Sequence, residues 1–277
     1  MDLLVVGAGE MGRWFARTLA DGLAEPPTVA FADRDAQTAS AAAAAVGDSG
    51  DSDDGASDES VDARAVATDT DERFDIVAFA VPIPAVADAI GTHANRAERA
   101  LVDLSGEMRD SVAAMAAAAP DCERVSLHPL FAAANAPGNV AVAPDEPGPV
   151  TDRVRAALSA AGNDLFETTP AEHDRAMETV QARVHAAVLA FGLAAEDVRA
   201  EFQTPVSAAL FETLETVTGN DPRVYADIQT AFDGAEDVAA AAARIAEADA
   251  EEFASLYREA DDRASADGDS AAGGGQS

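Results

Sequence analysis

Three glycines near the N-terminus have the spacing of a phosphate-binding turn. Gly7, Gly9 and Gly12 lie between an apolar run, residues 2–6, and a segment whose apolar residues recur at helical spacing. In such a strand–turn–helix the glycines permit a tight turn, and backbone N–H groups at the helix N-terminus approach a pyrophosphate. Asp33 follows about twenty residues later, where a carboxylate binds the ribose hydroxyls. The pattern predicts a dinucleotide site that prefers NAD to NADP.

The predicted dinucleotide site extends beyond the glycines. Glu10 and Met11 lie inside the turn, and Val81 and Pro82 stand at the end of a later strand-like run. Arg34 directly follows the ribose-binding acid and could neutralise a 2′-phosphate, so NADP is a possible second cofactor. A glycine turn that binds no nucleotide is the alternative, and the strand and helix around the turn argue against it.

A histidine and a serine lie where an α/β sheet binds its ligand. His128 follows the strand-like run 124–127, and Ser105 follows the run 100–104. The carboxyl ends of parallel strands line the ligand crevice of an open sheet, so both side chains could converge beside a nicotinamide. A surface-loop histidine beside the turn-forming Pro129 is the alternative for His128.

Strands alternate with helices through the first 150 residues. Besides the runs above, 28–32 and 75–81 are strand-like, and Ala-rich helices separate the strands. The alternation implies an α/β Rossmann domain over residues 1–150 with a parallel, doubly wound sheet. The segment at about 47–63 is rich in Gly, Ser and Asp, and we expect a disordered or salt-solvated loop insertion there.

Long helices dominate after residue 150. Only 164–167 remains a plausible strand, and apolar stripes mark several helices. We therefore expect an all-α domain over 151–263 and a disordered tail over 264–277. These helices carry more apolar surface than a small helical layer can bury, which predicts a homodimer formed through the C-terminal helices.

The composition narrows the possible partners. The 277 residues include 51 acidic and 18 basic side chains, all of the latter Arg, for a formal net charge of −33. Molar salt shortens the Debye length to roughly 3 Å and mutes the self-repulsion, so this charge is typical of a salt-adapted organism. The same charge argues against nucleic acids and anionic membranes as partners.

The chain also lacks the residues for several kinds of site. Cys122 is the single cysteine, so neither an intrachain disulfide nor a thiolate-rich metal site can form, and no carboxylate spacing resembles a metal site. No basic leader precedes the first strand, and no apolar stretch is long and charge-free enough to span a bilayer. We expect a cytoplasmic protein without a metal.

Taken in order, the motifs resemble the prephenate/arogenate dehydrogenase family over roughly residues 3–231. The matching segments are the GxGxMG turn, the Ser105–Gly106 turn, the HPLF segment at 128–131, the EHD segment at 172–174, the Gln181-x-x-x-His185 helix and the DPRVYADIQ segment at 221–229. No single segment is decisive, but the ordered set is.

The resemblance implies an oxidative decarboxylation in tyrosine biosynthesis. Hydride leaves C4 of prephenate for the nicotinamide of NAD, carbon dioxide departs, and the product is 4-hydroxyphenylpyruvate. A neutral imidazole at His128 could accept the 4-hydroxyl proton, because an ordinary His pKa near 6.5 leaves the ring mostly neutral. Ser105 would hydrogen-bond and orient the same hydroxyl.

The substrate carboxylates need cations, and Arg is the only basic residue type in the chain. Arg183 and Arg223 are the candidates. The family usually presents an arginine on the helix before the Asp-Pro turn, where this chain has FETLET at 211–216. Gln181 and His185 share a helix face and are further candidates for substrate binding, although a satisfied interdomain histidine is an equal alternative for His185.

The remaining histidines have structural interpretations. His173 and Asp174 open a long helix, where an acidic residue suits the helix dipole, and we expect capping and packing from them. His93 lies in a polar stretch at the end of a predicted helix, and we expect it to face solvent.

Other functions fit part of the pattern. Arogenate dehydrogenase, another two-domain NAD(P)-dependent dehydrogenase and a non-catalytic NAD-sensing dimer are the alternatives. A 3-hydroxyacid dehydrogenase generally relies on a catalytic Lys, and a chain without Lys excludes it.

Overall fold

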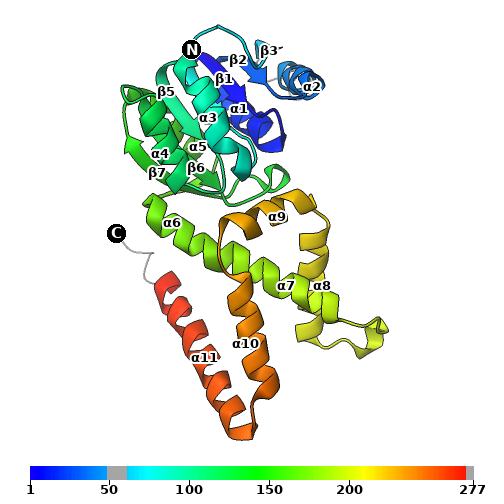
Figure 1. The fold of residues 1–277 in the computed structure, drawn as a ribbon. Coiled ribbons are helices and arrows are strands. Elements are labelled where there is room, and N and C mark those ends of the chain that lie inside the picture. The colour runs from blue at the N-terminus through cyan, green and yellow to red at the C-terminus, as the bar shows by residue number, and fades with distance from the viewer. Residues whose placement is uncertain (49–60, 273–277) are drawn as a thin grey trace. The chain divides into compact units, whose positions relative to one another are not determined.

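Eight strands form a single sheet in the order β3-β2-β1-β4-β5-β6-β7-β8. Figure 1 shows the fold as a ribbon coloured from the N-terminus to the C-terminus. The computed structural model describes residues 1–48 and 61–272, so most of the acidic insertion predicted at 47–63 lies outside the described residues. The strands are β1 Asp2–Val6, β2 Thr28–Ala32, β3 Ala63–Ala65, β4 Phe74–Phe79, β5 Ala97–Asp103, β6 Glu123–Pro129, β7 Asn139–Glu146 and β8 Asp164–Glu167. The first six are parallel and have the Rossmann order, which confirms the predicted fold class.

The far end of the sheet departs from the predicted all-parallel arrangement. Strand β7 runs antiparallel to β6, and β8 pairs in parallel with β7. Fewer than a dozen residues connect β6 to β7, and such a connection is too short for the crossover that a parallel pair requires. Neither β7 nor β3 was predicted. Pro144 and the polar ends of β7 obscure its alternating apolar pattern, and β3 has only three residues, which is too short to show a pattern.

Successive side chains of each strand supply two cores on opposite faces of the sheet. Leu3 and Val5 of β1 pack with residues of helices α1, α2 and α5, whereas Leu4 and Val6 pack with residues of α3 and α4. The helices of this part of the chain are α1 Glu10–Gly22, α2 Ala36–Gly47, α3 Val86–His93, α4 Arg109–Ala118, α5 Pro149–Ala160 and α6 Pro170–Met177.

The chain divides into two compact units, each described here by itself. The first contains Met1–Glu178 and Asp221–Phe232, and the second contains Thr179–Asn220 and Asp233–Ser277. The boundary therefore differs from the one expected near residue 150. Helix α5 packs against α1 and β8 extends the sheet, which holds residues 149–167 in the first unit.

Helix α9, Pro222–Ala231, also belongs to the first unit and packs against the 3₁₀ turn Ile83–Ala85. Asp221 caps this helix by accepting a hydrogen bond from the backbone N–H of Arg223, and Pro222 occupies the first helical position, where a missing N–H costs nothing.

The second unit is helical, as expected. It contains α7 Val184–Ala194, α8 Pro205–Thr218, α10 Ala235–Glu247 and α11 Ala250–Ala272, and α7 packs with both α8 and α10. Helix α11 includes residues 264–272, so the tail expected to be disordered from 264 is helical over that stretch, where alanines favour a helix. No helix in the described ranges 1–48 and 61–272 is long and apolar enough to cross a membrane.

Candidate active site at the carboxyl ends of the parallel strands

The glycine turn has the geometry of a phosphate-binding loop. Gly7 has a φ of +97°, and a Cβ there would lie 2.3 Å from the carbonyl oxygen of Ala80. A Cβ on Gly12 would lie 2.1 Å from the carbonyl oxygen of Gly7, so only glycine lets the helix start so close to the strand. A Cβ on Gly9 would meet no atom within 4 Å, which leaves open space at the N-cap of α1.

The carboxylate of Asp33 is fixed beside this turn. Its Oδ2 accepts a hydrogen bond of 2.9 Å from the backbone N–H of Ala8, and its Oδ1 accepts one of 3.0 Å from the backbone N–H of Asp35. Because no side chain caps α1, the open turn and the fixed carboxylate could hold the pyrophosphate and ribose of a dinucleotide. Of the other predicted cofactor residues, Glu10, Arg34 and Pro82 are exposed, and Met11 and Val81 are partly exposed.

The segment that follows β4 lies close to both the glycine turn and the Gly106 turn beside His128. Val81 Cγ1 lies 2.9 Å from the position of a Cβ on Gly7. Ile83 Cδ1 and His128 Nε2 lie 3.3 Å and 3.6 Å from the position of a Cβ on Gly106. The structure therefore brings the glycine turn and His128 to the same edge of the sheet, at the carboxyl ends of β1, β4, β5 and β6.

His128 lies within β6 and not in a loop after it. The strand continues to Pro129 because β7 pairs with it, and His128 faces Ala141 in the register. The imidazole is buried, with 9% of the residue exposed. Its Nδ1 lies 2.9 Å from Nε2 of His173, whereas its Nε2 has no hydrogen-bond partner in the part of the chain that the structure describes.

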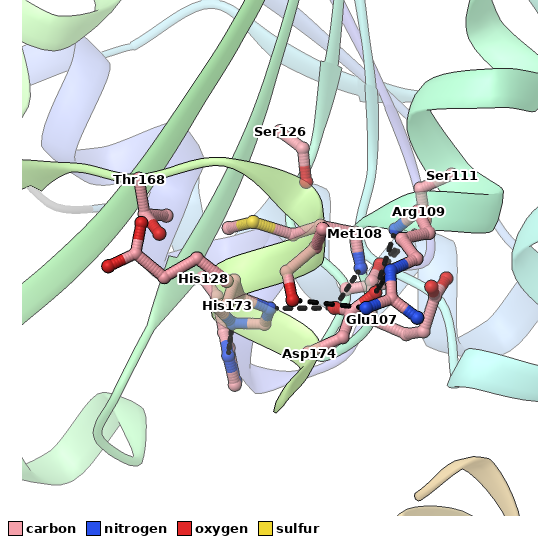
Figure 2. Close-up of polar contacts among 12 residues, drawn as sticks. Glu107, Met108, Arg109, Ser111, Ser126, His128, Thr168, His173 and Asp174 are labelled. Carbon is pink, nitrogen blue, oxygen red and sulfur yellow. Dashed lines mark hydrogen bonds and ion pairs between the residues drawn. The ribbon is translucent and has the colours of Figure 1, made fainter. Parts of the chain in front are cut away.

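His173 continues this contact to a carboxylate. Its Nδ1 lies 2.8 Å from Oδ1 of Asp174. Figure 2 marks this contact with a dashed line. The Asp174 carboxylate also accepts hydrogen bonds from the backbone N–H groups of Met108 at 3.0 Å and Arg109 at 3.2 Å. Asp174 thus binds the N-terminus of α4, while Thr169 caps the helix α6 to which Asp174 itself belongs. The packing role predicted for His173 and Asp174 is therefore incomplete, because His173 also contacts His128 and Asp174 also contacts His173.

Burial and neighbouring charges set the protonation of this group. Burial, with a smaller contribution from His173, lowers the pKa of His128 to about 3, so the ring is neutral at ordinary pH. Burial opposes ionisation of Asp174, but hydrogen bonds from His173 and the Met108 amide outweigh it and lower the carboxyl pKa. Burial and the adjacent Asp174 raise the pKa of Glu107 to about 7.

Ser105 belongs to a second buried polar group beneath this edge. Its Oγ lies 3.0 Å from Asp103 Oδ2, 3.0 Å from Ser111 Oγ and 2.9 Å from the Glu107 carbonyl oxygen. Ser126 Oγ donates to the same Asp103 carboxylate at 2.7 Å. Burial raises the pKa of Asp103 to about 6, although the hydrogen bonds from Ser126 and Ser105 oppose the shift. A substrate contact from Ser105 remains a prediction, and donation to a substrate would require its hydroxyl proton to leave these acceptors.

The predicted substrate-binding residues lie in different units. Arg223 is exposed on α9, the helix that packs against Ile83–Ala85. Gln181, Arg183 and His185 belong to the second unit, where Arg183 forms an ion pair with Asp237 at 2.6 Å. Burial lowers the pKa of His185.

One further prediction about a side chain is wrong. His93, expected to face solvent, is 5% exposed at the end of α3, where its Nδ1 contacts Arg96. Burial, followed by the charge of Arg96, lowers the pKa of His93 to about 4. Over residues 1–48 and 61–272, no cluster of His, Cys, Asp and Glu could hold a metal ion.

Sequence reasoning missed the partners of the two predicted catalytic residues. Asp103 was expected only as part of the strand-like run 100–104, and no role was predicted for Glu107, although both flank Ser105 in the segment DLSGE. A polar residue at every second position after an apolar strand was the available signal. The link between His128 and His173 spans 45 residues and has no local pattern.

Comparison with known proteins identifies the family. No protein-family model matches the chain. It is 30% identical over 208 residues to a 4-amino-4-deoxyprephenate dehydrogenase of Streptomyces pristinaespiralis, covering 67% of this chain and 69% of that protein. Its fold matches prephenate dehydrogenase from A. aeolicus in complex with hydroxyphenyl propionate and NAD+ (TM-score 0.63, 16% identity, 96% and 98% of the two chains). It also matches Synechocystis arogenate dehydrogenase (TM-score 0.60, 16% identity, 98% and 99%). The chain thus belongs to the prephenate/arogenate dehydrogenase family of oxidoreductases.

Proposed function

We propose that the protein oxidises and decarboxylates prephenate to 4-hydroxyphenylpyruvate with NAD as hydride acceptor, as a step of tyrosine biosynthesis. The observation that carries the proposal is His128, a buried neutral imidazole whose Nε2 faces the Gly106 turn at the edge of the sheet where the dinucleotide turn lies. The NAD+ complex of the A. aeolicus enzyme, which has the same fold, supports the choice of cofactor. Asp33 supports NAD over NADP, because its carboxylate would repel a 2′-phosphate.

The residues of the first unit account for the proton chemistry. NAD, when bound, supplies the acceptor for the hydride that leaves C4 of the substrate. His128 Nε2 takes the proton of the C4 hydroxyl as that hydride leaves, and the O–H electron pair forms the C4 carbonyl. Loss of the ring carboxylate as carbon dioxide then leaves its bonding electrons to aromatise the ring, and His128 returns the proton to the ring oxygen. The base is unchanged at the end of the cycle.

Arginine side chains are proposed to bind the substrate carboxylates. Arg223 is the stronger candidate, because its guanidinium is exposed on the helix that packs against Ile83–Ala85 and has no ion pair with any residue in the described ranges. Arg183, Gln181 and His185 remain proposed contributors from the second unit. Ser105 is proposed to orient the C4 hydroxyl beside His128.

A second candidate substrate has a specific observation behind it. The relative from S. pristinaespiralis is named for a substrate with an amino group at C4, and arogenate dehydrogenase shares the fold. Neutral His128 could accept a proton from a C4 amine as it could from a hydroxyl. Prephenate, arogenate and 4-amino-4-deoxyprephenate should therefore be compared directly.

The test is NADH formation by the purified full-length protein with each of these three substrates in about molar KCl, which screens the acidic surface. We expect turnover with prephenate and a fall in kcat of about 10²–10⁴ in His128→Asn, because a positioned general base contributes that factor. His93→Asn is the control, since it removes another buried histidine of the same unit. NAD binding without turnover of any of the three would support the non-catalytic alternative.

The second unit is proposed to form a homodimer. Large apolar side chains are exposed along it: Leu193, Val198, Phe202, Val206, Ile245, Phe253 and Tyr257, of which Leu193 is 89% and Val206 74% exposed. An apolar surface of this kind is typical of an interface between protein chains. A cytoplasmic location is part of the same proposal.

A further inference from the structure

We infer that His173 and Asp174 are positioning residues that determine which nitrogen of His128 carries its proton, so that Nε2 is left as the base. The feature that carries the inference is a line of three side chains within the first unit (Figure 2). Its kinetic consequence rests on the proposed function, whereas the protonation pattern is a property of the free protein.

The direction of the hydrogen bonds is set from the Asp174 end. A carboxylate only accepts hydrogen bonds, and Asp174 is held ionised by the N–H groups of Met108 and Arg109. The Arg109 side chain adds a cation, with its Nε 3.6 Å from Asp174 Oδ2. The proton in the 2.8 Å contact between His173 and Asp174 therefore lies on Nδ1 of His173.

The same logic then fixes His128. When the His173 ring is neutral and carries its proton on Nδ1, its Nε2 has a lone pair and is an acceptor. At 2.9 Å, His128 must supply the donor, which places its proton on Nδ1 and its lone pair on Nε2. A neutral histidine side chain without such a partner favours the opposite tautomer, in which Nε2 carries the proton and cannot accept another. The contact with His173 therefore holds His128 in its less common, basic form.

The arrangement also suits the charged state of His128. When Nε2 takes the substrate proton, the ring becomes an imidazolium whose Nδ1–H still donates to His173. The carboxylate of Asp174, on the far side of His173, stabilises that positive charge across the buried site. Glu107 is the other acid beside Asp174, and Arg109 is the cation there.

Imidazole ¹⁵N NMR of the full-length protein tests the inference without any substrate. The spectrum, with ¹⁵N-labelled histidine in about molar KCl, is assigned with His128→Asn. In the unaltered protein, His128 should show a protonated Nδ1 and an unprotonated Nε2. In His173→Phe, which keeps a ring but removes both nitrogens, the His128 proton should move to Nε2. His173→Gln should restore the original pattern, because its amide oxygen can accept from Nδ1–H, and His93→Phe is the matched control.

Kinetics provide the second readout. His173→Phe should lower kcat by about 10²-fold, which is the lower end of the contribution of a positioned base. The Kd for NAD and the KM for substrate should be nearly unchanged. His173→Gln should recover most of the lost kcat. A proton on Nε2 of His128 in the unaltered protein would overturn the inference, as would a His128 tautomer that does not respond to His173→Phe. If His173→Phe does not fold, the spectrum of the unaltered protein still decides. Absence of turnover in a protein with the expected tautomer would refute the proposed function alone.

Discussion

A methyl group on Gly9 is expected to weaken dinucleotide binding without unfolding the protein. The ideal Cβ at this position meets no protein atom within 4 Å, and the backbone φ of −70° and ψ of −168° suit alanine. Replacing glycine at a compatible position stabilises a protein by about 0.4–1 kcal/mol through the unfolded chain, and the poorer N-cap preference of alanine offsets part of that gain. The free energy of unfolding of Gly9→Ala should therefore stay within about 1 kcal/mol of the unaltered protein.

The affinity for NAD should fall, because the added methyl group occupies the open space in which the backbone would approach a pyrophosphate. We expect the Kd for NAD to rise by about tenfold or more, which corresponds to about 1.4 kcal/mol. Isothermal titration of NAD and urea unfolding, both in about molar KCl, measure the two quantities separately.

Two other glycines are the controls. Gly91→Ala places a methyl in similarly open space within helix α3 and should leave the Kd for NAD unchanged, with a gain of about 0.5–1 kcal/mol in stability. Gly12→Ala, whose Cβ would lie 2.1 Å from the Gly7 carbonyl oxygen, should distort the turn and lower the unfolding midpoint. Unchanged NAD affinity in Gly9→Ala would refute the assignment of this turn to a pyrophosphate.

Three further outcomes are expected. Stability should fall as pH drops from 6.5 toward about 3, because the folded protein keeps His128 neutral while the unfolded chain binds a proton there, and urea unfolding of His128→Asn should show a shallower slope over that range. Arg223→Gln should raise the KM for prephenate at least about tenfold with little change in the Kd for NAD, since it removes a charge-assisted contact; an unchanged KM would exclude this arginine from the carboxylate site. Light scattering in molar salt should give the mass of a dimer, and Val206→Glu, on the exposed apolar face of α8, should shift it toward a monomer; a monomer for the unaltered protein would contradict the proposed dimer.

The parallel half of the sheet could be predicted because local patterns determine it. The buried runs that form β1, β2, β4, β5 and β6 are apolar and separated by helices, as doubly wound sheets require. The antiparallel β7 could not be predicted in the same way, since its pairing depends on the length of the connection after β6 and on the neighbouring β8. Because β7 pairs with β6, His128 lies in a strand and not in the loop where it was expected, and the hydrogen-bonded strand backbone positions its imidazole.

The glycine turn and Asp33 were predicted as one site from spacing alone, and the hydrogen bond from the Ala8 N–H to Asp33 joins them in space. The histidine group could not be found in that way. Asp174 suits the start of α6 on dipole grounds, and this local explanation concealed its bonds to the N-terminus of α4. The Asp174 carboxylate therefore connects α6 to the N-terminus of α4 and also contacts His173. The residues next to it in the sequence indicate only its position in the first turn of α6.

The two buried polar groups at this edge of the sheet have opposite consequences for a proton. Around Asp103, the hydroxyl groups of Ser105 and Ser126 donate to a carboxyl group whose pKa is raised by burial. Around His128, the inferred hydrogen bonds run from His128 Nδ1 to His173 Nε2 and from His173 Nδ1 to Asp174. They leave the lone pair of His128 Nε2 unused beside the Gly106 turn. Within the histidine group, Nε2 of His128 is therefore the atom that can accept a substrate proton. Burial disfavours the charged imidazole that results, and the nearby carboxylate of Asp174 offsets part of that cost.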